Sequence, residues 1–319
     1  MKRGDAYFLK DELDKAIADY TEAIRLDPDY AEAYLWRGNM YSFKDEFDKA
    51  IADHTEAIRL DPDYAEAYKC RGDAYKEKDE FDMAIADYTE AIRLNPDYAE
   101  AYLWRGIVYY IMDALVMAFV DYNEAIRLDP DYAYAYIRRG NAYFEEGEFD
   151  MAIEDYTKAI NLDPNDAYAY YSRGLAYHYK EDYDRAIADY TQAIKLNPND
   201  ADVYYNRGLA YRYKEDYDRA IVDYTQAIKL DPNDAGAYNN RGWTYALKGD
   251  YNQAIADANA SLLIRPNDAN TLHTRGYAYA GKGDYDRAIA DFEAALKIDP
   301  NLAEARRDLE LAQQAETQE

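Results

Sequence analysis

The nine prolines of this 319-residue chain constrain its fold more than any other feature, because every neighbouring pair is 34 residues apart. They are Pro28, Pro62, Pro96, Pro130, Pro164, Pro198, Pro232, Pro266 and Pro300. A strict period of this length is the signature of a protein built from stacked repeats. The chain therefore has to be divided into repeats before any domain boundary is drawn.

We number each repeat so that its proline is position 32. The full repeats are then 31–64, 65–98, 99–132, 133–166, 167–200, 201–234, 235–268 and 269–302, after a partial repeat at 1–30. Because a repeat array grows by adding units that need no new core, we predict a single solenoid over 1–302. Residues 303–319 are predicted to form a C-terminal capping helix, with a frayed tail from residue 315.

Each repeat has the pattern of two helices. In 31–64, Tyr34, Gly38 and Tyr41 share one helical face, and a second helical series runs over 47–58 after the polar turn at 44–46. The proline at position 32 then stops the second helix.

The start of the following helix carries a signal of its own. Asp63, followed three residues later by Glu66, predicts a capping box, and Asp29 with Glu32 and Asp97 with Glu100 repeat it.

A recurrent set of residues gives the family resemblance. In 31–64 the set is Tyr34, Gly38, Tyr41, Ala50, His54, Ala57 and Pro62. This pattern resembles the tetratricopeptide repeat (TPR), and the resemblance covers 1–302. It implies an all-α fold, a right-handed superhelical solenoid of antiparallel helix pairs, with a concave groove lined mainly by the first helix of each repeat.

Two columns depart from the family pattern. Position 7, usually leucine in the family, is arginine in every repeat, and position 23 is aspartate in every repeat. We predict structural ion pairs, because a partly buried guanidinium needs a carboxylate partner. Examples are Arg37 with Asp53, Arg71 with Asp87, Arg105 with Asp121, and Arg173 with Asp189. The alternative is that these arginines bind acidic groups of a ligand.

The resemblance implies that positions 2, 5, 9, 12 and 13 face the groove, and these positions are aromatic in the middle of the chain. Aromatic side chains with polar tips are frequent anchors for peptides. The candidate groove residues are Tyr134, Ile137, Tyr168, Tyr171, Tyr179, Tyr205, Asn206, Tyr213, Asn240 and Trp243. The alternative is that some of them pack against neighbouring repeats as core. The clamp that the family uses for a terminal carboxylate is incomplete, because Lys69 at position 5 is followed by Asp73 in place of asparagine at position 9, and no repeat has lysine at position 2.

The repeat 99–132 is an outlier, because between residues 106 and 120 its one charged residue is Asp113. Ile111, Met112, Ala114 and Val116 are expected where other repeats present charge to water. The candidate apolar patch comprises Tyr110, Ile111, Met112, Leu115, Val116 and Phe119. An exposed apolar patch marks an interaction surface, and self-association through 106–120 is one interpretation. Sequence drift, or packing against a neighbouring repeat, is the other.

The formal net charge of −27 argues against nucleic-acid partners, because such a surface repels phosphate backbones. No apolar run reaches the length needed for membrane insertion. The three histidines are far apart and Cys70 is the single cysteine, so we expect no metal site, no cofactor and no catalytic residues.

We therefore predict a non-enzymatic scaffold that binds a peptide or a partner protein in its groove. Two alternatives remain open: a substrate-recruiting region of a larger multidomain protein, for example an enzyme, and a structural spacer. A cytoplasmic location is expected. Met1 falls at position 5 of its repeat, however, which leaves open an earlier start with a targeting signal.

Overall fold

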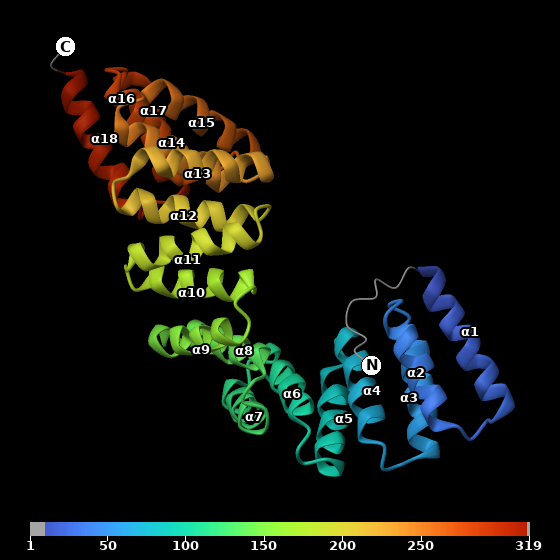
Figure 1. The fold of residues 1–319 in the computed structure, drawn as a ribbon. Helices are drawn as coiled ribbons and strands as arrows, with labels where there is room; N and C mark the ends of the chain where they lie inside the picture. Colours follow the sequence, from blue (N-terminus) through green and yellow to red (C-terminus); the bar gives the residue numbers. More distant parts are fainter. Residues whose placement is uncertain (1–9, 318–319) are drawn as a thin grey trace. The chain divides into compact units, whose positions relative to one another are not determined.

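The computed structural model describes residues 10–317 and contains eighteen helices and no strand within that range (Figure 1). This confirms the all-α prediction. The chain divides into two compact units, Met1–Glu148 and Phe149–Glu319, which are described separately below. The beginning of the partial repeat, residues 1–9, lies outside the described residues.

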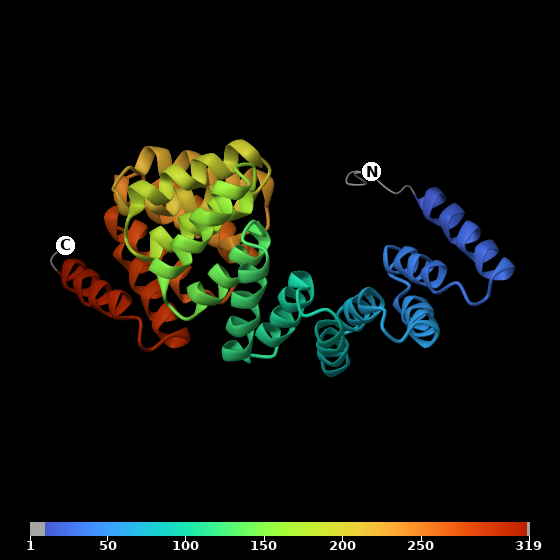
Figure 2. The same ribbon diagram turned by 60° about the horizontal axis from the view of Figure 1, so that its bottom comes forward.

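Over its described residues the first unit contains three complete helix pairs, preceded by α1 from the partial repeat and followed by α8, the first helix of the repeat 133–166. Their bounds are α1 Lys10–Leu26, α2 Ala31–Ser42, α3 Phe47–Leu60, α4 Ala65–Glu77, α5 Phe81–Leu94, α6 Ala99–Ile111, α7 Leu115–Leu128 and α8 Ala133–Glu145. The two helices of a repeat, such as α2 with α3 or α6 with α7, form the most extensive contacts. Figure 2 shows these helices following one another as short rods joined by tight loops.

In the second unit the first and second helices of successive repeats continue to follow one another (Figure 1). Its helices are α9 Phe149–Leu162, α10 Ala167–Tyr179, α11 Tyr183–Leu196, α12 Ala201–Tyr213, α13 Tyr217–Leu230, α14 Ala235–Lys248, α15 Tyr251–Ile264, α16 Ala269–Gly281, α17 Tyr285–Ile298 and α18 Ala303–Glu316. Helix α18 packs on α17 and also contacts α16, as expected of a cap. It extends two residues into the segment predicted to fray, and residues 318–319 lie outside the described part.

The two helices of a repeat can approach closely because position 8 is glycine. A Cβ atom on Gly106 would lie 2.9 Å from the ring of Tyr122, and one on Gly38 would lie 2.6 Å from the ring of His54. Each ring, at position 24, is fully buried. The small residue at position 20 is buried too, as in Ala50 and its counterparts. A side chain at position 8 would therefore overpack the repeat core.

The predicted capping boxes are not formed. The N-caps of α2, α4 and α6 are Tyr30, Tyr64 and Tyr98, one residue after the expected aspartates, and they make no side-chain capping bond. The aspartate one residue before the proline is used instead: the Asp61 carboxylate accepts a bond from the backbone N–H of Asp63 at 3.1 Å. It thus stabilises the turn that the proline begins, and the next helix is left without a cap.

Later repeats use a different start. Where the proline is followed by Asn-Asp, the aspartate becomes the N-cap, as at Asp166, whose carboxylate accepts from Tyr168 N at 2.8 Å and from Ala169 N at 3.1 Å. Aspartate caps because its side-chain oxygen reaches the free N–H groups of the first turn.

The turn within each full repeat has a residue in the left-handed conformation at position 15. Glycine supplies it at Gly147, Gly249 and Gly283, whereas Asp113 and Glu181 adopt φ of 60° despite their side chains. Glycine takes this conformation without steric cost, which explains its recurrence there.

Candidate functional site

In seven of the described repeats the arginine at position 7 is paired with the aspartate at position 23 of the same repeat. The Arg37 guanidinium donates from Nε and Nη2 to the two carboxylate oxygens of Asp53, both at 2.7 Å. The same two-pronged pair joins Arg71 to Asp87, Arg105 to Asp121, and Arg173 to Asp189, at 2.7–2.8 Å. Such a planar match satisfies both buried carboxylate oxygens.

The third edge of each guanidinium reaches the preceding repeat. Arg105 Nη1 donates to Thr89 Oγ1 at 3.0 Å, and Arg207 Nη1 donates to Thr191 Oγ1 at 3.0 Å. These arginines are therefore occupied by the scaffold itself, which disfavours the alternative that they bind a ligand.

Burial affects the titration of two of the aspartate partners. Burial raises the pKa of Asp121 and of Asp87, although the neighbouring arginine acts in the opposite direction. The pairs thus sit where an unpartnered charge would be costly.

Two of the predicted groove tyrosines are tied to the next repeat by the predicted asparagines. Asn206 Nδ2 donates to Tyr171 Oη at 3.2 Å, and Asn240 Nδ2 donates to Tyr205 Oη at 2.9 Å. The same amides also donate to backbone oxygens one turn earlier, at 2.9 and 3.0 Å. In each case a position-5 side chain bonds to position 6 of the following repeat, 35 residues later, and the amide N–H groups are already used.

At the next junction the tyrosine is missing, and a hollow opens. Position 5 is Asn239 there, a much shorter side chain, and position 6 of the following repeat is Thr274. The hollow has a volume of about 520 Å³. Its lining residues are Asn239, Asn240 and Trp243 from α14, Asn270, His273 and Thr274 from α16, and Leu302 and Glu304 at the start of α18.

The floor of this hollow is held by contacts within the chain. His273 Nε2 lies 2.9 Å from Asp308 Oδ2, again a position-5 to position-6 contact over 35 residues. The Trp243 ring lies 4.9 Å from the Tyr277 ring in an edge-to-face arrangement and 5.5 Å from the His273 ring, between centroids. These contacts hold the aromatic side chains in fixed orientations before any ligand arrives.

One polar atom of the hollow has no partner. Asn239 Oδ1 is buried and accepts no hydrogen bond. No protein group donates to this oxygen, so it is available to accept from an incoming N–H group. Glu304 is exposed, and no lysine or arginine is among the described residues that line the hollow.

Ile137 is a correction to the predicted groove set. It is 3% exposed and belongs to the core, because a branched aliphatic side chain without a polar tip gains more by burial than by facing water. Tyr134, on the same helix, is 39% exposed and lies beside Trp104, with ring centroids 6.2 Å apart. Within the first unit, Tyr134 therefore remains accessible and Ile137 does not.

The other predicted tyrosines of the second unit are exposed at the ends of their helices. Tyr179 stacks on Phe149 with centroids 5.4 Å apart, and Tyr213 stacks on Tyr183 at 5.1 Å. Tyr168 is also exposed. None of these three tyrosines lines the hollow at α14 and α16.

In the first unit, Lys69 stands at position 5, one of the positions of the carboxylate clamp, and is paired with carboxylates of its own chain. Lys69 Nζ lies 2.6 Å from Glu100 and 3.1 Å from Asp73, and Tyr88 Oη donates to Asp73 at 2.8 Å. Although burial alone would lower it, the pKa of Lys69 is raised by Asp73 and Glu100. Lys69 is thus engaged by carboxylates of its own chain and is a poor receptor for an acidic ligand.

A row of ion pairs runs along the outer turns, between position 14 of one repeat and position 18 of the repeat before it. Lys78 Nζ lies 2.8 Å from Asp48, and Lys44 Nζ lies 2.5 Å from Asp14. Lys180, Lys214 and Lys248 contact Asp150, Asp184 and Asp218 in the same way. We call this row the lysine–aspartate ladder.

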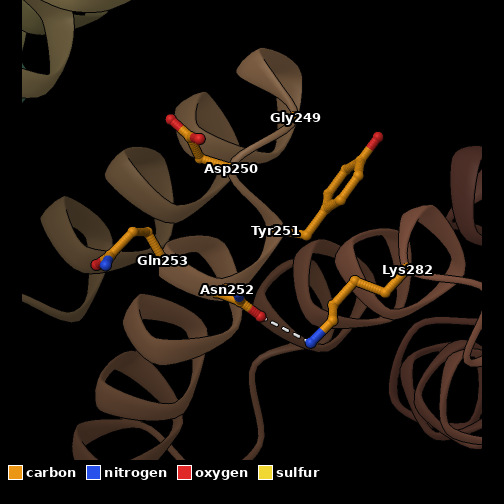
Figure 3. A pocket seen from close by; sticks show the side chains of 6 residues that line it. All are labelled: Gly249, Asp250, Tyr251, Asn252, Gln253 and Lys282. Atoms are coloured by element: carbon orange, nitrogen blue, oxygen red, sulfur yellow. Dashed lines mark hydrogen bonds between the residues drawn. The ribbon is translucent and has the colours of Figure 1, made fainter.

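A second hollow, of about 330 Å³, belongs to this ladder. Figure 3 shows Lys282 reaching across it to Asn252, whose Oδ1 accepts at 2.7 Å, with Tyr251 beside the pair. Its lining residues come from the turn after α14, the start of α15 and the end of α16, so it is a gap between ladder residues.

The predicted apolar patch of 99–132 is divided by the structure. Ile111, Met112 and Val116 are exposed, whereas Tyr110 and Phe119 are half-buried against the repeat core. Phe119 also packs on Tyr143, with centroids 4.7 Å apart. Tyr110 and Phe119 therefore contribute mainly to packing, and Leu115 is half-buried as well.

The lone cysteine and the metal-binding side chains bear on what chemistry the described residues could perform. Burial raises the pKa of the Cys70 thiol to about 12, which keeps it protonated and unreactive at neutral pH. No group of three or more metal-binding side chains lies together in the described part of the chain. The described helices are each too short or too polar to span a bilayer.

Sequence reasoning missed part of the hollow. Asn239, Asn270 and His273 stand at predicted groove positions but were not among the named candidates, and Thr274 and Glu304 were not recognised. The available signal was the loss of tyrosine at position 5 after two repeats that have it.

Family profiles match segments along most of the chain. Profiles described as "TPR repeat" match residues 4–44, 72–112, 140–181 and 174–212. Profiles described as "Tetratricopeptide repeat" match 31–64 and 201–234, 121–154 and 223–256, and 248–315. No curated protein is similar enough in sequence to count as a relative.

Solved structures show the same fold. YrrB, described as "a TPR protein with an unusual peptide-binding site", is 27% identical, with a TM-score of 0.52, over 58% of this chain and 96% of YrrB. MamA is 29% identical, with a TM-score of 0.50, over 54% of this chain and 93% of MamA.

The Cut9–Hcn1 structure is similar in fold at 24% identity, with a TM-score of 0.58, over 95% of this chain and 59% of the matched chain. The family profiles, the helix pairs and these structures together establish that this chain belongs to the tetratricopeptide repeat family.

Proposed function

We propose that this chain is a non-enzymatic scaffold that binds a peptide segment of a partner protein, with the hollow between α14 and α16 as a principal contact. The observation that carries the proposal is the hollow itself, with its unpartnered Asn239 Oδ1 beside the fixed ring of Trp243. YrrB, a structural relative, is described as having a peptide-binding site, which supports the same class of function here.

The chemistry of the hollow suggests how a peptide would bind. A backbone N–H of the peptide would donate to Asn239 Oδ1, and an apolar side chain would lie against Trp243. Glu304 at the rim would attract a lysine or arginine of the peptide. The negative net charge of the chain favours the same ligand, because a cationic peptide is drawn to it and an acidic one is repelled.

The test uses the full chain and a displayed library of random peptides. We expect the wild type to enrich sequences with basic and apolar residues and few carboxylates. Asn239→Tyr restores the side chain found at position 5 of the two preceding repeats, so it should fill the hollow without disturbing the fold. This variant and Trp243→Ala should lose the enriched peptides.

Trp36→Ala, which removes an exposed tryptophan of α2, is the matched control and should keep binding. Circular dichroism would show that each variant is folded. If the enriched peptides bound Asn239→Tyr as well as the wild type, the hollow would not be the site. Failure to enrich any sequence would favour the structural-spacer alternative.

A further inference from the structure

The lysine–aspartate ladder is interrupted in the first unit. Its first two junctions are closed by Lys44 with Asp14 and by Lys78 with Asp48. At the next junction, position 14 is Met112, and Asp82 has no lysine to pair with. The same repeat also has Val116 in place of the aspartate expected at position 18. Met112 therefore interrupts the junction with the preceding repeat, and Val116 interrupts the junction with the following one.

The interruption exposes apolar surface. The side chains concerned, which we call the outer patch, are Ile111, Met112, Val116, Met117 and Val120, with exposed fractions of 50%, 44%, 77%, 47% and 57%. They come from the end of α6 and the start of α7. A cluster of this kind on an otherwise charged surface is characteristic of a docking site.

Carboxylates border the outer patch without the cations that neutralise them elsewhere. Asp82, Asp113 and Glu146 are exposed, and Glu146 stands at position 14, where other junctions have lysine. No lysine or arginine occurs between residues 106 and 120. The surface is therefore apolar at its centre and negative at its edge.

We propose that the outer patch docks a basic amphipathic segment of a partner protein. Its apolar side chains would cover Met112, Val116 and Val120. One of its lysines or arginines would take the place of the missing lysine beside Asp82, and another would pair with Glu146. A second copy of this chain fits poorly, because it would bring the same carboxylates to the interface in a molecule of net charge −27. This surface is separate from the hollow at α14 and α16, and the inference does not depend on peptide binding there.

The test measures binding of a fluorescent model peptide made of leucine and lysine and patterned as an amphipathic helix. A peptide of the same composition in scrambled order controls for general attraction to an acidic protein. The main variant, Met112→Lys/Val116→Asp, installs the residues found at these positions in intact repeats and leaves the net charge unchanged. We expect it to weaken the patterned peptide at least about tenfold, with the wild-type affinity falling as salt rises.

A matched pair of single variants tests the position. Val120 and Val222 both occupy position 22 and are both exposed, at 57% and 67%. Val120→Thr should weaken the peptide a few-fold, whereas Val222→Thr should leave its affinity unchanged. Asn239→Tyr should also have no effect, which separates this proposal from that of the hollow.

Equal affinity of the wild type and Met112→Lys/Val116→Asp, with both shown to be folded by circular dichroism, would overturn the proposal. So would equal binding of the scrambled peptide. If light scattering showed a wild-type dimer that the double variant abolishes and the peptide does not displace, the occupant would be a second copy and the basic partner would be excluded.

Discussion

The repeats α6–α7 and α12–α13 are nearly identical inside and differ outside. In both, an arginine holds an aspartate at two points: Arg105 and Asp121 at 2.8 Å, and Arg207 and Asp223 at 2.7–2.8 Å. In both, a position-8 glycine lies under a buried tyrosine, where a Cβ atom would come within 2.9 and 3.0 Å of the ring. The interior of the repeat is thus conserved along the chain.

The outer turns of the same two repeats have opposite character. In α12–α13, Lys214 contacts Asp184 of the previous repeat and Asp218 contacts Lys248 of the next. In α6–α7 the corresponding residues are Met112 and Val116, which are exposed and apolar. The fold therefore constrains the residues in the interior of a repeat, whereas the residues of its outer turn can vary and acquire a function.

The largest expected effect tests whether the two interiors are equivalent. Asp121→Ala and Asp223→Ala each leave an arginine without its buried partner, which should cost about 3–5 kcal/mol in the free energy of unfolding. Urea denaturation would measure it, with Asp184→Ala as a surface control that should lose less than about 1 kcal/mol. A loss at one repeat but not at the other would break the equivalence.

The interior of a third repeat, α2–α3, should make the stability of the protein depend on pH. His54 occupies the buried tyrosine position of α2–α3, and its ring nitrogens have no partner. Burial, with a smaller effect of Arg71, lowers the pKa of His54 from 6.5 to about 3. The folded state therefore stays neutral while the unfolded state binds a proton below pH 6.5. Stability should be unaffected by this group above pH 6.5 and fall by about 1.4 kcal/mol per pH unit below it.

The measurement is the free energy of unfolding of the wild type and of His54→Phe between pH 6.5 and about 5, above the range in which most carboxylates titrate. Phenylalanine suits the site, because Phe292 fills the equivalent position in α16–α17. The two stabilities should diverge as the pH falls. Parallel curves would mean that His54 is protonated in the folded state, contrary to its burial.

The smallest expected effects concern the outer turns. Lys214→Met breaks an intact rung of the ladder, and Met112→Lys restores a missing one. Because exposed ion pairs contribute little, each change should alter the free energy of unfolding by less than about 1 kcal/mol, in opposite directions. Thermal melting would detect the shifts. A loss of several kcal/mol in Lys214→Met would show that the outer turn is part of the stabilising core, and the distinction between inside and outside would fail.

The sequence predicted the fold because repetition reports geometry directly. The constant arginine and aspartate columns indicated a pairing partner, and the proline period gave the helix boundaries closely. The capping boxes were mispredicted, because whether Asp63 caps α4 depends on the backbone conformation of the turn, which the residue types do not determine.

The candidate site was harder to predict. The hollow exists because Asn239 is too short to make the contact that Tyr205 makes with Asn240. That contact joins position 5 of one repeat to position 6 of the next, 35 residues later, and the pattern of residues within a single repeat does not reveal it. Ile137 was misplaced for a related reason. The position of a residue in the repeat indicates toward which side of the helix its side chain points, but the size and polarity of that side chain decide whether it packs into the core.

The bond from each position-7 arginine to the preceding repeat has a consequence for how such a chain changes over time. Arg71 reaches Thr55, Arg105 reaches Thr89 and Arg241 reaches Thr225, with the same donor and acceptor atoms at 3.0–3.1 Å. The joints made by Arg139 and Arg275 differ, because their Nη1 atoms donate to the side-chain oxygens of Asn123 and Asn259. Where neighbouring joints share the same donor and acceptor, duplication or deletion of one whole repeat by recombination would leave a joint closed by the same chemistry. The array could thus lengthen or shorten there in steps of 34 residues.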